Sequence, residues 1–96
     1  MKIKFAPSAR GQLLTAIAHI ASENPAAARR VRARVEKALN RLCRFPNVGR
    51  RIPEFPERPH RELIVSPYRI FYRANGKTIW VVAVDDFMIV PNSRPG

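Results

Sequence analysis

The residues best suited to chemistry lie in a basic stretch that joins Phe45 to Val84. There, arginines alternate with aromatic and aliphatic residues in the order FPNVGRRIPEFPERPHRELIVSPYRIFYRANGKTIWVVAV. A guanidinium group can hold a phosphate or a carboxylate through two parallel hydrogen bonds, and arginine supplies 14 of the 18 cationic side chains. The net charge of +11 favours a counter-charged partner, either a nucleic acid or an acidic protein. Composition alone leaves both kinds of partner open.

The elements that must position these arginines begin with a short strand and two helices. Lys2 to Ala6 alternates polar and apolar residues and is followed by Pro7, which predicts a first strand that ends at the proline. Apolar residues then recur every three or four positions from 8 to 22, the spacing of an amphipathic helix. Asn24 and Pro25 predict the start of a second helix, about 25–44, with Asn24 as its N-cap. Because almost nothing joins the helices, we expect an antiparallel hairpin that covers a sheet.

The second half of the chain predicts a loop followed by antiparallel strands. Five prolines and glycines between residues 45 and 60 indicate an irregular basic loop. The segments RELIVS, YRIFYR and TIWVVAV are rich in β-branched and aromatic residues, and Asn75-Gly76 predicts a type I′ hairpin turn between the last two. In the middle strand we expect Tyr68, Ile70 and Tyr72 to face one way, with the arginines on the other side. The tail DDFMIVPNSRPG allows one more short strand.

The second helix also carries a row of five cations at steps of four, three, four and three residues. They are Arg30, Arg34, Lys37, Arg41 and Arg44. This spacing places them along one side of the helix. The row is either a solvated face or a surface that contacts a nucleic-acid backbone, and both interpretations stay open.

Several other kinds of protein are disfavoured by the composition. The length predicts one domain, residues 1–96, of α+β class. Cys43 is the one cysteine, so no disulfide forms within the chain, and the two histidines lack metal-ligand spacing, so we expect no metal and no cofactor. There is no signal-peptide pattern and no apolar stretch long enough for a membrane. These features predict a cytoplasmic protein with neither a membrane nor a small molecule as its partner.

Four motifs in this order, NPAAA, FPNVGRRIPE, RELIV and YRIFYR, resemble the RelE/ParE superfamily of toxins of type II toxin–antitoxin systems. The resemblance covers roughly residues 2 to 90. It implies a compact β-α-α-β-β-β fold in which the helix hairpin packs on a small twisted antiparallel sheet. It also implies a bacterial cytoplasmic toxin and a cognate antitoxin that wraps the toxin and blocks it. The net charge of +11 predicts that this antitoxin is acidic.

The superfamily has two functional branches, and a third interpretation lies outside it. The ParE-like branch poisons DNA gyrase without hydrolytic chemistry of its own, and we favour it for this chain. The RelE-like branch cuts messenger RNA on the ribosome. The third interpretation is a small non-toxic module that binds nucleic acid, although recognised nucleic-acid motifs are missing.

The chemistry of RNA cleavage explains this preference. Attack by a 2′-hydroxyl needs a base, a cation for the phosphorane charge and an acid for the leaving oxygen. Compared with the RelE-like branch, Arg69 matches the arginine of the Tyr-Arg motif. Glu62, however, occupies a position where the members that use lysine have a cation. Asp85 and Asp86 follow the last strand and would repel the phosphate. The catalytic residues are therefore left unknown, and candidates can be named only for a nuclease. These candidates are Arg69, Glu54, Glu57, His60 and Tyr68.

Two sets of residues are predicted to contact partners. The target-binding candidates are Arg50, Arg51, Arg58, Arg61, Arg69 and Arg73. The antitoxin-binding candidates are Leu13, Ile17, Arg30, Arg34, Trp80 and Val82. An alternative for three of the arginines is structural, with Arg61, Arg69 and Arg73 pairing to glutamates to fasten the loop to the sheet. The glutamates considered for this role are Glu54, Glu57 and Glu62.

Overall fold

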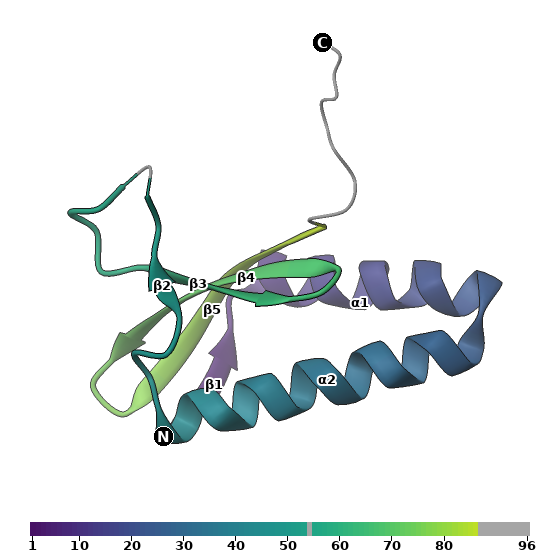
Figure 1. Ribbon diagram of the computed structural model, residues 1–96, viewed down its shortest axis with the longest axis horizontal. Coiled ribbons are helices and arrows are strands. Elements are labelled where there is room, and N and C mark those ends of the chain that lie inside the picture. Colours follow the sequence, from purple (N-terminus) through teal and green to yellow (C-terminus); the bar gives the residue numbers. More distant parts are fainter. Residues whose placement is uncertain (54, 87–96) are drawn as a thin grey trace, which may run out of the picture.

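Two helices cover one face of a five-stranded sheet (Figure 1). This computed structural model describes residues 1–53 and 55–86. The elements follow in the order β1 (Lys2–Phe5), α1 (Pro7–Glu23), α2 (Pro25–Arg44), β2 (Arg50–Arg51), β3 (Arg61–Val65), β4 (Tyr68–Asn75) and β5 (Thr78–Asp86). The predicted α+β class and the order of strand, helix hairpin and strands are confirmed.

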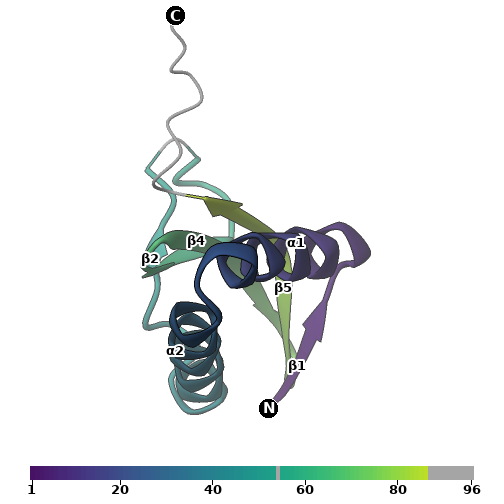
Figure 2. The ribbon, with the colours of Figure 1, turned by 90° about the vertical axis from the view of Figure 1, so that its right-hand side faces the viewer.

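The sheet has the strand order β1-β5-β4-β3-β2. The last four strands of the chain pair antiparallel, as expected, while β1 adds a parallel pair with β5. The helix hairpin therefore carries the chain from one edge of the sheet to the other, because β1 and β2 are its two edges. Figure 2 turns the molecule so that α2 is seen nearly end-on, with the strands curving around it. No helix in the described ranges is long and apolar enough to cross a membrane.

The junction at Asn24 ends one helix and begins the next. Its backbone N–H donates to the Ile20 carbonyl, which closes α1, and its side-chain Oδ1 accepts from the Ala27 N–H at 3.0 Å. Pro25 occupies the first turn of α2, where a missing N–H costs nothing. The predicted N-cap and the predicted bounds of the second helix are confirmed. The first helix begins at Pro7, one residue earlier than expected, and the first strand accordingly ends at Phe5.

The core lies between α2 and the covered face of the sheet. On β4, Tyr68, Ile70 and Tyr72 are buried there, which confirms the predicted alternation. The other members of this core include Val31, Val35, Leu39, Leu42, Val65, Ile79, Val81 and Val84. The first helix contributes less, since Ala9 is its one fully buried residue and Leu14 is 59% exposed. An apolar strip of α1 therefore remains at the surface.

The structure corrects two local predictions. The loop expected at 45–60 contains the two-residue strand β2, whose Arg50 and Arg51 pair with Glu62 and Arg61. The hairpin between β4 and β5 is confirmed, but its central residues are Gly76 and Lys77, and among the described residues only Gly76 has positive φ, at 63°. A type I′ turn needs positive φ at both central positions, so that turn type was wrong. Of the tail, Asp85 and Asp86 belong to β5, and the further strand suggested for the tail lies outside the described residues.

Tyr72 fastens the segment before β2 to the sheet. Its hydroxyl accepts a hydrogen bond from the Gly49 N–H and donates one to the Pro46 carbonyl, both at 2.9 Å. Burial raises the pKa of Tyr72, so the hydroxyl keeps the proton that it donates. A Cβ at position 49 would lie 2.6 Å from the Tyr72 hydroxyl oxygen and 2.7 Å from the Glu62 carbonyl oxygen. Position 49 therefore requires glycine because of this close approach.

We predict that Gly49→Ala lowers the free energy of unfolding by about 1–3 kcal/mol, because the methyl group displaces Tyr72 or the backbone of β3. Urea denaturation measures the change. Gly11→Ala is the matched control, since a Cβ there meets nothing within 4 Å and alanine favours the helix. Equal stability of the two variants would contradict the prediction.

Candidate functional site

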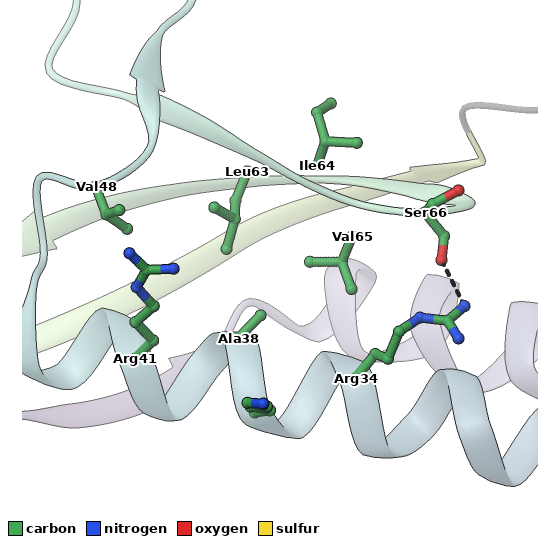
Figure 3. A pocket seen from close by; sticks show the side chains of 9 residues that line it. Arg34, Ala38, Arg41, Val48, Leu63, Ile64, Val65 and Ser66 are labelled. Carbon is green, nitrogen blue, oxygen red and sulfur yellow. Dashed lines mark hydrogen bonds between the residues drawn. The ribbon is translucent and has the colours of Figure 1, made fainter.

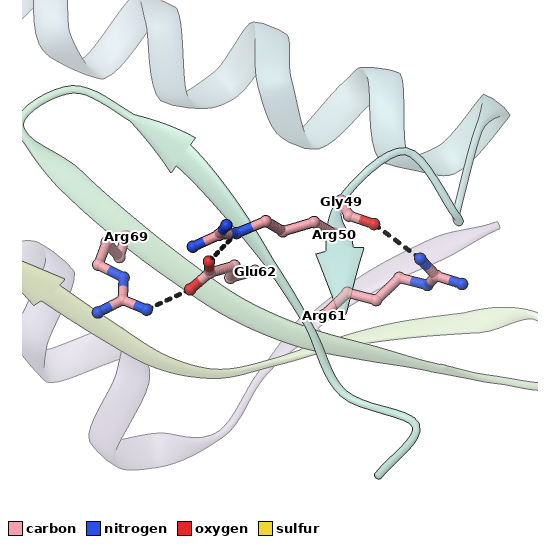
Figure 4. A network of polar contacts seen from close by, with 5 residues as sticks. All are labelled: Gly49, Arg50, Arg61, Glu62 and Arg69. Carbon is pink, nitrogen blue, oxygen red and sulfur yellow. Dashed lines mark hydrogen bonds and ion pairs between the residues drawn. The ribbon is translucent and has the colours of Figure 1, made fainter. Parts of the chain in front are cut away.

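A buried carboxylate held by two arginines is the main polar cluster on the uncovered face of the sheet (Figure 4). Glu62 Oε1 accepts a hydrogen bond from Arg69 Nη2, and Oε2 accepts one from Arg50 Nε. Glu62 is 2% exposed and is the one buried charged residue in the described part of the chain. We call these three residues the Glu62 cluster.

The strand register brings the cluster together. Glu62 lies opposite Arg50 on β2 and opposite Phe71 on β4, while Arg69 lies opposite Ile64, the next residue of β3 on the same face. Arg69 is thus the diagonal neighbour of Glu62, within reach of a long side chain. Since alternate residues of a strand face opposite sides, the same register turns Leu63 and Val65 toward the helices. The arginine of the YRIFYR motif therefore meets a carboxylate rather than open solvent.

The cluster keeps Glu62 ionised. Burial alone would raise the pKa of this carboxyl, but the hydrogen bonds and charges of Arg69 and Arg50 outweigh burial and lower the pKa below its ordinary value of 4.5. Each carboxylate oxygen accepts from a different strand, so Glu62 joins β2, β3 and β4. A carboxylate that is buried, doubly paired and of lowered pKa is a weak proton acceptor at neutral pH.

The other nuclease candidates do not gather around Arg69. Tyr68 is buried on the helix-covered side of β4, whereas Arg69 lies on the uncovered side. His60 lies beside Arg58 and Arg73, and burial first, then those two charges, lower its pKa below 6.5. Four strand positions separate Arg69 from Arg73, about 13 Å along β4. Glu57 is exposed in the loop, and Glu54 lies outside the described residues.

The six target-binding candidates separate into two groups. Four are engaged within the protein: Arg50 and Arg69 bind Glu62, Arg61 Nη1 donates to the Gly49 carbonyl at 2.8 Å, and Arg51 Nη1 reaches the Pro56 and Arg58 carbonyls. The alternative in which an arginine pairs with a glutamate to fasten the loop to the sheet is thus confirmed for Arg69 and Glu62. Arg50 is a second partner of Glu62 that the sequence did not indicate. Arg58 and Arg73 form no ion pair with another described residue.

Cations and aromatic rings alternate across the uncovered face and onto the neighbouring loop. Arg69 lies over the Phe71 ring at 5.0 Å, and Lys4 lies over the Trp80 ring at 5.8 Å. In the loop, which projects away from the helices (Figure 1), Arg58 lies over the half-exposed Phe55 ring at 5.5 Å. Aromatic faces hold guanidinium and ammonium groups without neutralising them. This face is therefore aromatic and cationic.

The antitoxin-binding candidates fall on three surfaces. Leu13 and Ile17 line an apolar groove of about 480 Å³ between α1 and α2. Arg30 and Arg34 are exposed on α2, and Arg34 Nη2 donates to the Ser66 carbonyl at 3.0 Å. Trp80 and Val82 are half-buried on β5. The sequence analysis did not single out Val48 and Ile64, two exposed apolar residues that line one groove together with Arg34. The available signals were an apolar residue in the proline-rich segment and a β-branched residue near the end of a predicted strand.

The described residues offer little for other chemistry. Within residues 1–53 and 55–86, no three side chains of His, Cys, Asp or Glu lie close enough to hold a metal ion together. Cys43 is a half-buried free thiol on α2. The arrangement is thus suited to binding anionic or acidic surfaces.

Comparisons with known proteins give one family match and one similar fold. The family model described as the ParE toxin of the type II toxin–antitoxin system parDE matches residues 3–86. A solved structure described as the chromosomal ParDE toxin–antitoxin system from P. aeruginosa is similar in fold, with a TM-score of 0.69 and 20% sequence identity, over 90% of this chain and 95% of that chain. No curated protein sequence matches the chain.

The first prediction from this site concerns pH. Because the folded protein lowers the pKa of Glu62, the cluster stabilises the fold fully above the ordinary value of 4.5 and loses that contribution as the pH falls through the lower, folded value. Glu62→Gln should reduce stability at pH 7 by about 1–3 kcal/mol and flatten the decline in acid. Urea midpoints from neutral to acid pH measure both effects. Glu57→Gln, in the exposed loop, should follow the wild-type curve, and a Glu62→Gln curve parallel to wild type would refute the assignment.

The second prediction compares the two arginines. The Arg69 side chain is 25% exposed and that of Arg50 is 67% exposed. Water can therefore replace the charge of Arg69 beside Glu62 less well than it can replace that of Arg50. We expect Arg69→Met to cost about 2–4 kcal/mol and Arg50→Met about 1 kcal/mol or less. Chemical denaturation of both variants in one buffer gives the ranking. The opposite order would show that Arg50 is the main partner.

Proposed function

The chain belongs to the family of ParE toxins of type II toxin–antitoxin systems, and we propose that it inhibits growth by poisoning DNA gyrase until a cognate antitoxin neutralises it. Gyrase acts in the bacterial cytoplasm, so the proposal places the protein there. It treats residues 1–96 as one toxin domain, and it gives the antitoxin an acidic character because the chain carries a net charge of +11.

The observation that carries the choice of gyrase over messenger RNA is the Glu62 cluster. A ribonuclease would need Arg69 free for the phosphorane charge, with an acid and a base beside it. Here both oxygens of Glu62 are occupied by arginines, and Tyr68 lies on the opposite side of β4. The guanidinium of Arg69 therefore supports the sheet, which favours a toxin that acts by binding a large enzyme.

The surface proposed to meet gyrase is the uncovered face of the sheet together with the loop between β2 and β3. Arg73 on β4 and Arg58 in the loop keep their charges free of ion pairs with other described residues, and Phe55 and Trp80 add aromatic area beside them. Arginine and aromatic residues are the types most often found at the energetic centre of an interface. Arg50, Arg51, Arg61 and Arg69 would act there indirectly, by holding this surface in shape.

The test combines the purified protein with gyrase, ATP and supercoiled plasmid. We expect linear DNA to accumulate after detergent and protease treatment, because a poisoned gyrase retains its covalent link to cut DNA. The double variant Arg58→Ala/Arg73→Ala should need at least about ten times more protein for the same cleavage. Arg10→Ala/Arg29→Ala removes the same charge from the helices and should match wild type.

Other outcomes select other functions. Ordered cuts in ribosome-bound message in a purified translation mixture, with no effect on gyrase, would assign the protein to the RelE-like branch. Harmless expression in a bacterial host, without an antitoxin, would favour the non-toxic binding module. Equal losses in the two double variants would show that total charge, and not this surface, governs the effect.

A further inference from the structure

Five cations form a row along one side of α2, and the proposed contact with gyrase leaves them unused. They are Arg30, Arg34, Lys37, Arg41 and Arg44. All five are exposed, and because α2 is helical throughout Pro25–Arg44, their steps of four and three residues place them on one side. Figure 3 shows the middle of this α2 cation row, where Arg34 and Arg41 extend from the helix toward the edge of the sheet.

The α2 cation row keeps its charge. Arg34 donates its hydrogen bond to the carbonyl of Ser66, and Arg44 lies over the ring of Phe45 at 5.7 Å. Neither of these partners is charged, so neither neutralises a guanidinium. The other three cations form no ion pair and no hydrogen bond with another described residue. They are Arg30, Lys37 and Arg41.

The stability of the helix explains only part of the row. Cations in the last turn interact favourably with the helix dipole, which accounts for Arg41 and Arg44. The other three cations stand in earlier turns. Like charges three or four residues apart repel one another and destabilise a helix, and every step of this row is of that kind. The single acidic residue of α2, Glu36, pairs with Arg32 at 3.5 Å and so relieves none of this repulsion.

We propose that the α2 cation row binds the phosphate backbone of double-stranded DNA, including the duplex that gyrase holds. The choice of DNA rests on the proposed function. At 1.5 Å per residue the row spans about 21 Å from Arg30 to Arg44, with a cation roughly every 4–6 Å. One strand of DNA carries one negative charge for about every 3.4 Å of helix axis. The charge densities of the row and of a DNA strand are therefore comparable.

Other partners use the row less well. The centre of a protein interface needs apolar or aromatic anchors, and α2 exposes no large apolar side chain. Single-stranded nucleic acids stack their bases on aromatic rings, and α2 contains no aromatic residue. An apolar groove of about 460 Å³ toward β3 is lined by the three middle cations of the row, but Arg30 and Arg44 extend the row beyond it. The full row therefore suits a ligand that is charged along its whole length.

The experiment measures fluorescence anisotropy of a labelled DNA duplex against the full chain at several salt concentrations. A duplex of about 20 base pairs is long enough for the row, and five phosphate contacts should give a slope of about −4.5 in a plot of log affinity against log salt. Two duplexes of unrelated sequence should bind equally, because phosphate contacts carry no sequence information. A tenfold preference for one sequence, or binding that does not saturate, would overturn the proposal.

A matched pair of variants tests whether the row is responsible. Lys37→Gln/Arg41→Gln should make the slope less steep by about 1.8 and weaken binding at low salt by at least about tenfold. Arg10→Gln/Lys77→Gln also removes one arginine and one lysine, from exposed positions outside α2, and should change both quantities far less. Circular dichroism confirms that each variant is folded. Equal effects of the two variants would show that total charge governs binding and would refute the row.

Competitors separate DNA from the other polyanions. Unlabelled duplex DNA should displace the probe at least as well as duplex RNA of the same length, and better than polyglutamate at the same concentration of charge. Tenfold stronger competition by the RNA would assign the row to RNA. Stronger competition by polyglutamate would assign it to an acidic protein. Either result overturns the proposal.

The gyrase reaction separates this inference from the proposed function. Lys37→Gln/Arg41→Gln should need at least about ten times more protein than Arg10→Gln/Lys77→Gln for the same cleavage of plasmid. A protein that linearises DNA with gyrase but does not bind the duplex probe refutes the DNA-binding row alone. A protein that binds the probe as described but leaves gyrase unaffected refutes the proposed target alone, and the DNA-binding row stands.

Discussion

The rest of the structure depends on one buried negative charge in a chain of strongly positive character. Glu62 is removed from water, a position that an unpaired carboxylate could not occupy without protonation. Arg69 and Arg50 make that position tenable, and they come from the strands on either side. The ion pairs thus fix the short strand β2 against the sheet. With Tyr72 and Gly49 holding the preceding segment, the basic loop is anchored at its base although it has little core of its own.

This anchoring divides the arginines by task. Four arginines donate hydrogen bonds to Glu62 or to backbone carbonyls, whereas Arg58 and Arg73 form no ion pair with another described residue. The uncovered face of the sheet is therefore a cationic, aromatic surface for the proposed target, and the opposite face holds the core under the helices.

The sequence predicted the parts of this fold that local physics determines. Asn24 and Pro25 define a helix junction through capping alone, and the alternation in YRIFYR follows from strand geometry. Prediction failed where the outcome depends on register. The pairing of Arg50 with Glu62 depends on β2, and a strand of two residues is too short to be predicted from its sequence. The central residues of the turn are Gly76 and Lys77, one position later than predicted, because the β4–β5 register places Asn75 opposite Thr78. Likewise, the sequence does not distinguish Arg69 from Arg73. Both lie two positions from Phe71, the residue opposite Glu62, yet among the described residues only Arg69 of these two forms an ion pair with Glu62.

The parallel pairing of β1 with β5 has a consequence for how the toxin is made. Lys2 aligns with Thr78 and Phe5 with Val81, so residues near the start of the chain find their places only after the final described strand has been synthesised. Such distant pairings make folding slow compared with local helix formation. A nascent chain can therefore form its helical hairpin early, but it cannot complete its sheet until β5 has been synthesised.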